Sequence, residues 1–477
     1  MHDHTTDSGI RSTVDVHRWA FWITVSIYAL INVVIWLTTE PEFRLRHAGD
    51  GDSWYLPAVG LFDHGTFVYP DTPGEPNVYR PPLFPIFGAA MFWLFQEVTP
   101  NAIAFGQIIL LLVTGLVFRN SINDWYPGWG TLGMALLLFN PNVLTIVQFT
   151  QSDPLFLFFM TASLWAVLRF AKGQNGWRYS MIAGTTIAMA CLTRPTAQFL
   201  IVVLPLVFPI LTALNRNYSD RWRSCAQGCA SFILAIVLIS PWLIHVQEVD
   251  GRYGLSDSES RYRYLWDQII MVESQSNNLS YSQAERRLAV GPTSLRAELI
   301  EEYGASWKDL TDSQRLAYLT DKGFGILLSY SASDLAKAYA RSVAQFLFGG
   351  GSGRLHYILK SNPEQLAELW FKTSQANLVG MVREFIRTAS PVALAASGIA
   401  LGFVLFARIV GTVGLISLAR KRAWPLLAAL IPFIMYFALI HLFVGNSRYR
   451  MVTEPALMFL VVIGLEAIWR KIGIRYQ

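Results

Sequence analysis

The chain has 477 residues, of which 53% are hydrophobic, 14% aromatic and 15% charged. Soluble proteins carry about 25% charged residues, so this deficit, with long apolar runs along the whole chain, predicts a polytopic α-helical membrane protein. The net charge of +5 is small and the basic residues adjoin apolar runs, which argues against nucleic-acid binding. The three cysteines, none of them in residues 247–390, indicate neither a disulfide framework nor a cysteine-based zinc site.

Apolar runs of spanning length predict about ten transmembrane helices, each needing roughly 20 residues. They lie at 19–38, 102–118, 130–149, 154–170, 178–192, 196–214, 226–246, 391–409, 423–444 and 452–469. One further run, 82–97, has about 16 residues, too few to cross the hydrocarbon core, and is expected to be a juxtamembrane helix.

Loop charge predicts which side each loop faces. With the N-terminus in the cytoplasm and 82–97 flat on the outer surface, the cytoplasmic loops hold most of the lysines and arginines, as the positive-inside rule requires. If 82–97 spanned the membrane, the excess of positive charge after it would face outward. We therefore expect both termini inside. The polar stretches hardest to explain structurally then share the outer face, namely 49–55, 151–153, 193–195, 247–390 and 447–450.

Three parts follow along the chain. Residues 1–246 are predicted to form an N-terminal transmembrane catalytic module whose first outer loop is 39–101. Residues 247–390 form a mostly helical extracytoplasmic segment, and residues 391–477 form the C-terminal transmembrane helices. Within the middle segment, 333–348 is amphipathic and suited to the membrane interface, and the glycine-rich stretch that follows it predicts a loop.

An acidic and aromatic stretch, Gly49-Asp50-Gly51-Asp52-Ser53-Trp54-Tyr55, follows the first apolar run, and Tyr79-Arg80-Pro81-Pro82 comes soon after it. Charged groups beside a membrane are costly, which favours a functional role. A carboxylate at the outer surface can act as general base or bind a divalent cation. An extended Asp-Gly-Asp would direct both carboxylates to one side. The alternative is a solvated loop or a cap for the helix starting near Ser53.

These residues resemble the first outer loop of the GT-C glycosyltransferases, in particular family 39-like enzymes: protein O-mannosyltransferases and bacterial lipid A aminoarabinose transferases. The resemblance is carried by Asp52-Ser53-Trp54-Tyr55 and Arg80-Pro81-Pro82-Leu83-Phe84-Pro85. Three later stretches match in order: 148–155 resembles the second outer loop, 192–196 the Arg-Pro turn, and 447–455 the Arg-Tyr stretch before the last helix. The resemblance covers roughly 40–240 and 420–470.

The resemblance implies a GT-C-type bundle and an inverting transfer of sugar from a polyprenyl-phosphate carrier to a lipid, glycan or protein acceptor. It implies a bacterial cytoplasmic membrane, with the site facing the periplasm or the exterior. Asp52 would deprotonate or orient the acceptor, although the presence of Asp50 leaves open which of the two is the base. Asp153 would bind a divalent cation (Mg²⁺ or Mn²⁺) or hold an arginine. Arg80, Arg194, Arg448, Tyr449 and Arg450 would bind the donor phosphate, and Tyr55 and Tyr79 would line the substrate.

Structural explanations compete at several of these positions. Arg448 and Arg450 could snorkel from a helix end, and Arg194 could cap one. Asp153, followed by Pro154, is typical of a helix start, a role that is compatible with ligand binding.

Two other functions fit a chain of this kind. A surface-polysaccharide ligase or polymerase also uses lipid-linked sugars, but usually through a large outer loop rich in Arg and His. A lipid-linked sugar transporter would place charges at the bilayer midplane and often shows paired halves, whereas here the charges adjoin the outer ends of the apolar runs and no repeat is visible.

Overall fold

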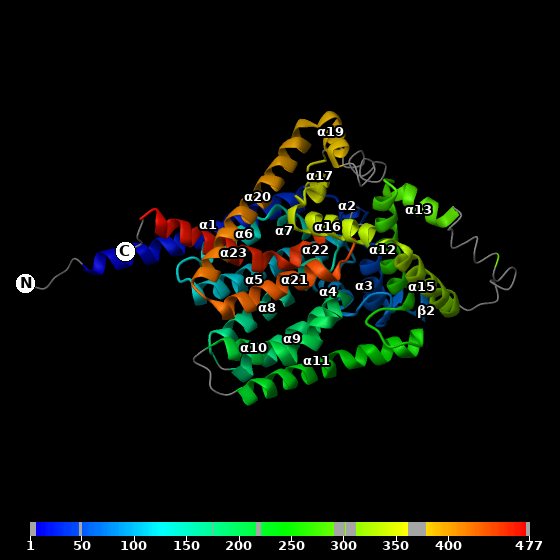
Figure 1. The fold of residues 1–477 in the computed structure, drawn as a ribbon, viewed down its shortest axis with the longest axis horizontal. Coiled ribbons are helices and arrows are strands. Elements are labelled where there is room, and N and C mark those ends of the chain that lie inside the picture. The colour runs from blue at the N-terminus through cyan, green and yellow to red at the C-terminus, as the bar shows by residue number, and fades with distance from the viewer. Residues whose placement is uncertain are drawn as a thin grey trace, which may run out of the picture.

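The computed structural model describes residues 6–46, 50–174, 176–215, 221–290, 301, 312–360 and 378–473. Long helices lie side by side in a bundle, with the start of α1 and the end of α23 at one end (Figure 1). Helices α3, α12 and α15 lie at the opposite end (Figure 1). In the described residues the sheet structure is a single two-stranded hairpin. The predicted all-α polytopic membrane fold is confirmed.

Within the described ranges, seven helical stretches are long and apolar enough to cross a membrane. They are Arg18–Thr38 of α1 (Thr6–Thr38), α5 (Pro100–Trp125), α8 (Asp153–Ala171), Pro195–Leu214 (η1, Pro195–Ala197, and α10, Gln198–Leu214), α11 (Arg221–Asp250), α20 (Pro391–Arg420), and Ser447–Lys471 (α22, Ser447–Arg450; η3, Met451–Thr453; α23, Glu454–Lys471).

The other three expected spans differ in detail. Helix α9 (Gly176–Thr193) has 18 residues but is not one of the seven stretches that are long and apolar enough to span. Helix α21 (Trp424–Ile440) is apolar but has only 17 residues. The run 130–149 breaks into α6 (Gly130–Leu138) and α7 (Pro141–Ile146). Asn140 is extended, and its side chain accepts a hydrogen bond from the Asn142 amide at 3.0 Å. Because proline disfavours a helical residue before it, Asn140 ends one helix and caps the next.

The first loop folds as a compact unit. Helix α2 (Pro41–Arg46) is followed by α3 (Asp52–His64), the hairpin of β1 (Val68–Tyr69) and β2 (Thr72–Pro76), and α4 (Leu83–Phe95). Buried Trp54, Phe84 and Phe92 join α3 to α4. Helix α4 has 13 residues, so it is too short to span the bilayer, as the sequence predicted.

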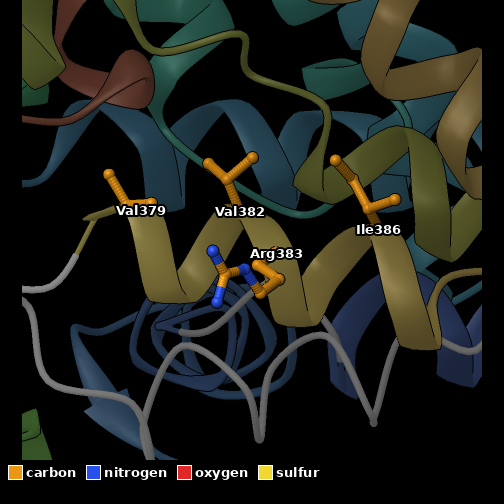
Figure 2. A pocket seen from close by; sticks show the side chains of 4 residues that line it. All are labelled: Val379, Val382, Arg383 and Ile386. Atoms are coloured by element: carbon orange, nitrogen blue, oxygen red, sulfur yellow. The ribbon is translucent and has the colours of Figure 1, made fainter.

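Residues 247–390 contain α12 (Ser258–Ser276), α13 (Tyr281–Val290), α15 (Asp312–Ser329), α16 (Ala332–Phe348), α17 (Gly353–Ile358) and α19 (Leu378–Thr388). Helices α12, α13 and α15 share an apolar cluster that includes Leu265, Ile269 and Ala284. Helix α19 exposes Val379, Val382 and Ile386 on one side, with Arg383 beside them (Figure 2). An amphipathic helix directly before α20 is typical of a membrane-interface element.

Glycines bring α20 and α23 into close contact. A Cβ atom on Gly414 would lie 2.0 Å from the carbonyl oxygen of Leu460, and one on Gly464 would lie 2.0 Å from that of Val410. Small residues at such crossings let helix backbones approach within a membrane. This contact fixes the last helix, whose N-terminal end carries the 447–455 stretch.

A candidate active site of arginines and carboxylates

Arg448 lies at the centre of a charged cluster. Its Nε and Nη2 donate to Oδ2 of Asp153 at 3.0 and 2.8 Å, and its Nη1 lies 3.0 Å from Oδ1 of Asp50. Asn446 positions this arginine locally, because its side chain accepts a hydrogen bond from the Tyr449 amide and caps α22. One guanidinium group therefore joins the first loop to the start of α8.

Asp50 is held by its own loop as well. Trp54 Nε1 donates to its Oδ2 at 3.2 Å, and Arg80 Nη2 lies 3.5 Å from the same oxygen. Arg80 also donates to Ser53 Oγ at 2.9 Å and stacks over the Trp54 ring. Although burial alone would raise it, Arg448, Arg80 and Arg194 hold the pKa of Asp50 well below its usual range. The carboxyl is thus ionised at neutral pH.

Asp153 and Arg194 form the deeper part of the cluster. Arg194 Nη1 lies 2.7 Å from Asp153 Oδ1, and the Asp153 side chain is 5% exposed. Asp153 is the first residue of α8, and Pro154 follows it, as the sequence indicated for a helix start. Its carboxylate nevertheless faces two arginines. Arg194 lies between α9 and η1 in an extended conformation.

Asp52 lies outside this cluster. It is exposed at the first position of α3, and its side chain makes no ion pair with the described residues. Asp50, by contrast, is 27% exposed and contacts two of the arginines. The structure therefore brings together Asp50, Asp153, Arg80, Arg194 and Arg448 but leaves Asp52 apart.

Arg450 also lies outside the cluster. It is fully buried, and its Nε lies 2.6 Å from Oε1 of Glu454, which is 1% exposed. Its Nη1 donates to the carbonyl oxygens of Phe346 and Gly349, each at 2.8 Å. Arg450 thus caps the C-terminal end of α16, and it points into the protein rather than snorkelling to the interface.

The three predicted tyrosines have different surroundings. Tyr449 stacks on His441 with ring centroids 4.0 Å apart, next to Arg448 in the chain. The Tyr79 ring has the guanidinium groups of Arg80 and Arg263 over it, at 4.7 and 6.0 Å. Tyr55 packs edge-on against Phe92, within the apolar contact of α3 and α4.

Sequence motifs gave no indication of Arg354. It lies in α17, and its Nη2 donates to Gln151 Oε1 at 2.8 Å, two residues before Asp153. Its charge interacts with those of Arg448, Asp153 and Asp50. An arginine just after the predicted glycine-rich loop was the available signal, but nothing in the sequence related it to the distant motifs.

Arginines, rather than further metal-ligating side chains, surround the two carboxylates of the cluster. In the part of the chain that the structure describes, no three His, Cys, Asp or Glu side chains are grouped so that they could hold a metal ion. The oxygens of Asp50 and Asp153 face guanidinium groups, which a cation would have to displace. Asp153 therefore holds arginines here, the second of the two roles expected for it.

Comparison with known proteins bears on this arrangement. Residues 79–245 match the family model of dolichyl-phosphate-mannose-protein mannosyltransferase. The chain is 28% identical over 222 residues to protein O-mannosyl-transferase 2 of Drosophila melanogaster, covering 40% of this chain and 27% of that protein. For the Drosophila pseudoobscura pseudoobscura protein of the same name the identity is 20% over 285 residues, covering 52% of this chain and 36% of that protein.

Two solved structures of the Archaeoglobus fulgidus oligosaccharyltransferase share the fold. The enzyme AglB in complex with an inhibitory peptide and a dolichol-phosphate superposes with a TM-score of 0.53 and 14% identity over 96% of this chain and 51% of that chain. The apo form gives a TM-score of 0.52 and 13% identity over 95% of this chain and 51% of that chain. The chain thus spans about half the length of these structures, and less of its sequence relatives.

The two superpositions show that the chain shares the fold of the archaeal oligosaccharyltransferase, which is the GT-C fold expected from the motifs. Within that class its residues 79–245 are similar to the protein O-mannosyltransferases, as the motifs predicted.

Proposed function

We propose that this chain is an inverting glycosyltransferase that moves a sugar from a polyprenyl-phosphate carrier to an acceptor. The observation that carries the proposal is the bridge from Arg448 to both Asp50 and Asp153, flanked by Arg80 and Arg194. Guanidinium groups bind phosphate through paired hydrogen bonds, and a carboxylate beside them can receive a proton from an acceptor. Relatives with the same fold include one solved with a dolichol-phosphate.

In the proposed reaction the acceptor oxygen attacks the anomeric carbon from the face opposite the phosphate. The bond between that carbon and the phosphate oxygen breaks, and the phosphate leaves with the electron pair. Arg80, Arg194 and Arg448 stabilise the charge that develops on it. Asp50 receives or orients the acceptor proton, a role that its contacts support better than the exposed position of Asp52.

The lowered pKa of Asp50 bears on whether the donor binds before or after the acceptor loses its proton. A carboxylate held by arginines is a weak base, and general bases work best with a pKa near the working pH. A bound phosphate would compete for Arg448 and Arg80 and so raise the basicity of Asp50. We therefore infer that the donor binds before the acceptor is deprotonated.

The proposed membrane is the bacterial cytoplasmic membrane, with the site toward the periplasm or the exterior. The charge bias of the loops supports this orientation. In a cysteine-free background, cysteine at Asp71, in the hairpin turn, should react with an impermeant maleimide on intact cells, whereas cysteine at Arg420 should not. Labelling of Arg420→Cys instead of Asp71→Cys would reverse the orientation.

Reconstituted protein tests the activity directly. Proteoliposomes are supplied with polyprenyl-phosphate sugars, and release of polyprenyl phosphate is followed with candidate lipid, glycan and peptide acceptors. We expect carrier sugar to be consumed without net movement of the lipid across the bilayer. Movement without consumption would identify a transporter and refute the transferase.

A further inference from the structure

Arg354 adds a cation to the cluster from a distant part of the chain. Its hydrogen bond to Gln151, at 2.8 Å, places it beside the turn that leads to Asp153. Gln151 itself is 1% exposed. Among the described residues, no carboxylate forms an ion pair with Arg354. This arginine therefore differs from Arg80, Arg194 and Arg448, each of which faces Asp50 or Asp153.

The connection leading to Arg354 is held in place. Gly351 has φ +75°, and a Cβ atom on it would lie 2.8 Å from the Asn142 side chain. Asn142 Nδ2 in turn donates to the carbonyl oxygen of Ser447, the residue before Arg448, at 2.6 Å. On the other side, His356 Nε2 lies 3.0 Å from Ser397 Oγ of α20. Arg354 and Arg448 are thus positioned relative to each other by neighbouring contacts.

The charges of the cluster do not cancel. Among the residues that the structure describes, four guanidinium groups (Arg80, Arg194, Arg354 and Arg448) face two carboxylates (Asp50 and Asp153), which leaves a surplus of two positive charges, four minus two. Burial lowers the pKa of Arg354 to about 10, so it is still cationic at neutral pH. Charges withdrawn from water are costly without a counter-charge, so this surplus favours binding of an anion.

The two ends of the proposed reaction differ in anionic charge. The sugar donor is a phosphodiester with one negative charge, whereas the released carrier is a phosphate monoester. A monoester carries up to two negative charges at neutral pH, because its second pKa is about 6. As the bond between the sugar and the phosphate breaks, the charge on the phosphate therefore rises from one negative charge toward two.

We infer that Arg354 binds the carrier phosphate and makes the site prefer the doubly charged monoester over the singly charged diester. This inference rests on the proposed function and names a residue that recognises the leaving group. An interaction that strengthens as charge develops accelerates the reaction, whereas one equal for both forms does not. The same preference makes the released carrier a strong competitor of the donor.

A pair of matched lipids tests the inference without knowledge of the sugar. The affinities of a short-chain polyprenyl phosphate and of its methyl diester are measured on the full chain in detergent by isothermal titration. In Arg354→Gln, the monoester affinity should fall by about tenfold, since a charge-assisted hydrogen bond contributes roughly that or more, while the diester affinity changes far less. Arg252→Gln, which removes an exposed arginine, is the control and should change neither.

Gln151→Glu is the second variant. This variant keeps Arg354 and the size of the side chain at position 151 but places a carboxylate beside the guanidinium group. The preference for the monoester over the diester should therefore be lost, as in Arg354→Gln. The wild-type preference should also decline below about pH 6, where the monoester takes up its second proton. In Arg354→Gln this decline should be reduced.

Three results would be decisive against the inference. An equal loss of affinity for the monoester and the diester in Arg354→Gln would show that Arg354 has a general structural role. An unchanged preference in Gln151→Glu would show that the charge of Arg354 is not what discriminates, even if Arg354→Gln fails to fold. If the wild-type protein binds neither lipid, the proposed donor class fails and the inference fails with it.

Discussion

The guanidinium group of Arg448 donates twice to a single carboxylate oxygen of Asp153, at 3.0 and 2.8 Å, across 295 residues of sequence. This contact ties the start of α8 to the short helix before α23. The same side chain reaches Asp50 in the first loop. Arg448 therefore connects three segments that are far apart in the chain, so the charged cluster depends on their tertiary packing.

Asp50→Asn and Asp52→Asn form a matched pair two residues apart. We expect Asp50→Asn to lower the transfer rate by about 10²-fold or more, the usual scale for loss of a general base. Asp52→Asn should leave the rate within about threefold of wild type, because Asp52 is exposed and outside the cluster. Initial rates in proteoliposomes, with folding checked by thermal unfolding, measure both. The reverse ranking would return the catalytic role to Asp52.

Substitution of Arg448 should weaken donor binding more than acceptor binding. Alanine leaves Asp50 and Asp153 without their shared partner, so part of its effect will be on folding. Arg448→Lys keeps the charge but cannot donate to both carboxylates in the same fork geometry. We expect the donor dissociation constant to rise by about tenfold or more in Arg448→Lys, with the acceptor KM nearly unchanged. Equal donor affinity in the variant and wild type would contradict the assignment.

The motifs named most of the residues in the cluster, and the two named residues that lie outside it, Asp52 and Arg450, do so for a common physical reason. The sequence argument took Asp-Gly-Asp as extended, which would place both carboxylates on one side. Gly51 is helical instead, with φ −57° and ψ −44°. At 3.6 residues per turn, side chains two positions apart diverge by about 200°. Asp50 and Asp52 separate for this reason, and so do Arg448 and Arg450 within α22.

Other features depend on contacts that no local pattern encodes. Arg354 reaches Gln151 across 203 residues, and nothing near it in sequence resembles a known motif. The break between α6 and α7 falls at Asn140-Pro141, a local turn signal inside the apolar run 130–149. The length of 82–97, by contrast, correctly predicted a helix too short to span.

Chelation should leave the activity intact. Because arginines face the oxygens of both Asp50 and Asp153, a divalent cation would have to replace them to bind there. After treatment with EDTA and assay in metal-free buffer, the transfer rate should stay within about twofold of that of the untreated enzyme. In the proposed reaction, guanidinium groups rather than a metal ion stabilise the charge on the leaving phosphate. A loss of activity that Mg²⁺ or Mn²⁺ restores would show that a metal enters the site with substrate.

The pH dependence of stability reports the charge of Asp50. Its pKa is lowered by Arg448, Arg80 and Arg194 against the effect of burial, so its folded value lies below the unfolded one of 3.8. The resulting stabilisation is fully present above that pH and is lost as pH falls through the folded value. The difference in Tm between wild type and Asp50→Asn should be constant from pH 8 to pH 5 and shrink only below pH 3.8. A difference that disappears between pH 7 and pH 5 would mean that the carboxyl has a raised pKa.

The pair of Arg450 and Glu454 should govern folding rather than donor binding. Both side chains are buried, and Arg450 also holds the carbonyl groups at the end of α16. Removal of one member of a buried ion pair costs about 3–5 kcal/mol, so Arg450→Ala should lower the Tm strongly. Arg450→Lys should lower it less, because the charge opposite Glu454 remains while part of the fork is lost. Below their unfolding temperatures, both variants should bind polyprenyl phosphate with an affinity close to that of wild type. A selective loss of lipid affinity in well-folded Arg450→Lys would instead place this arginine in the phosphate site.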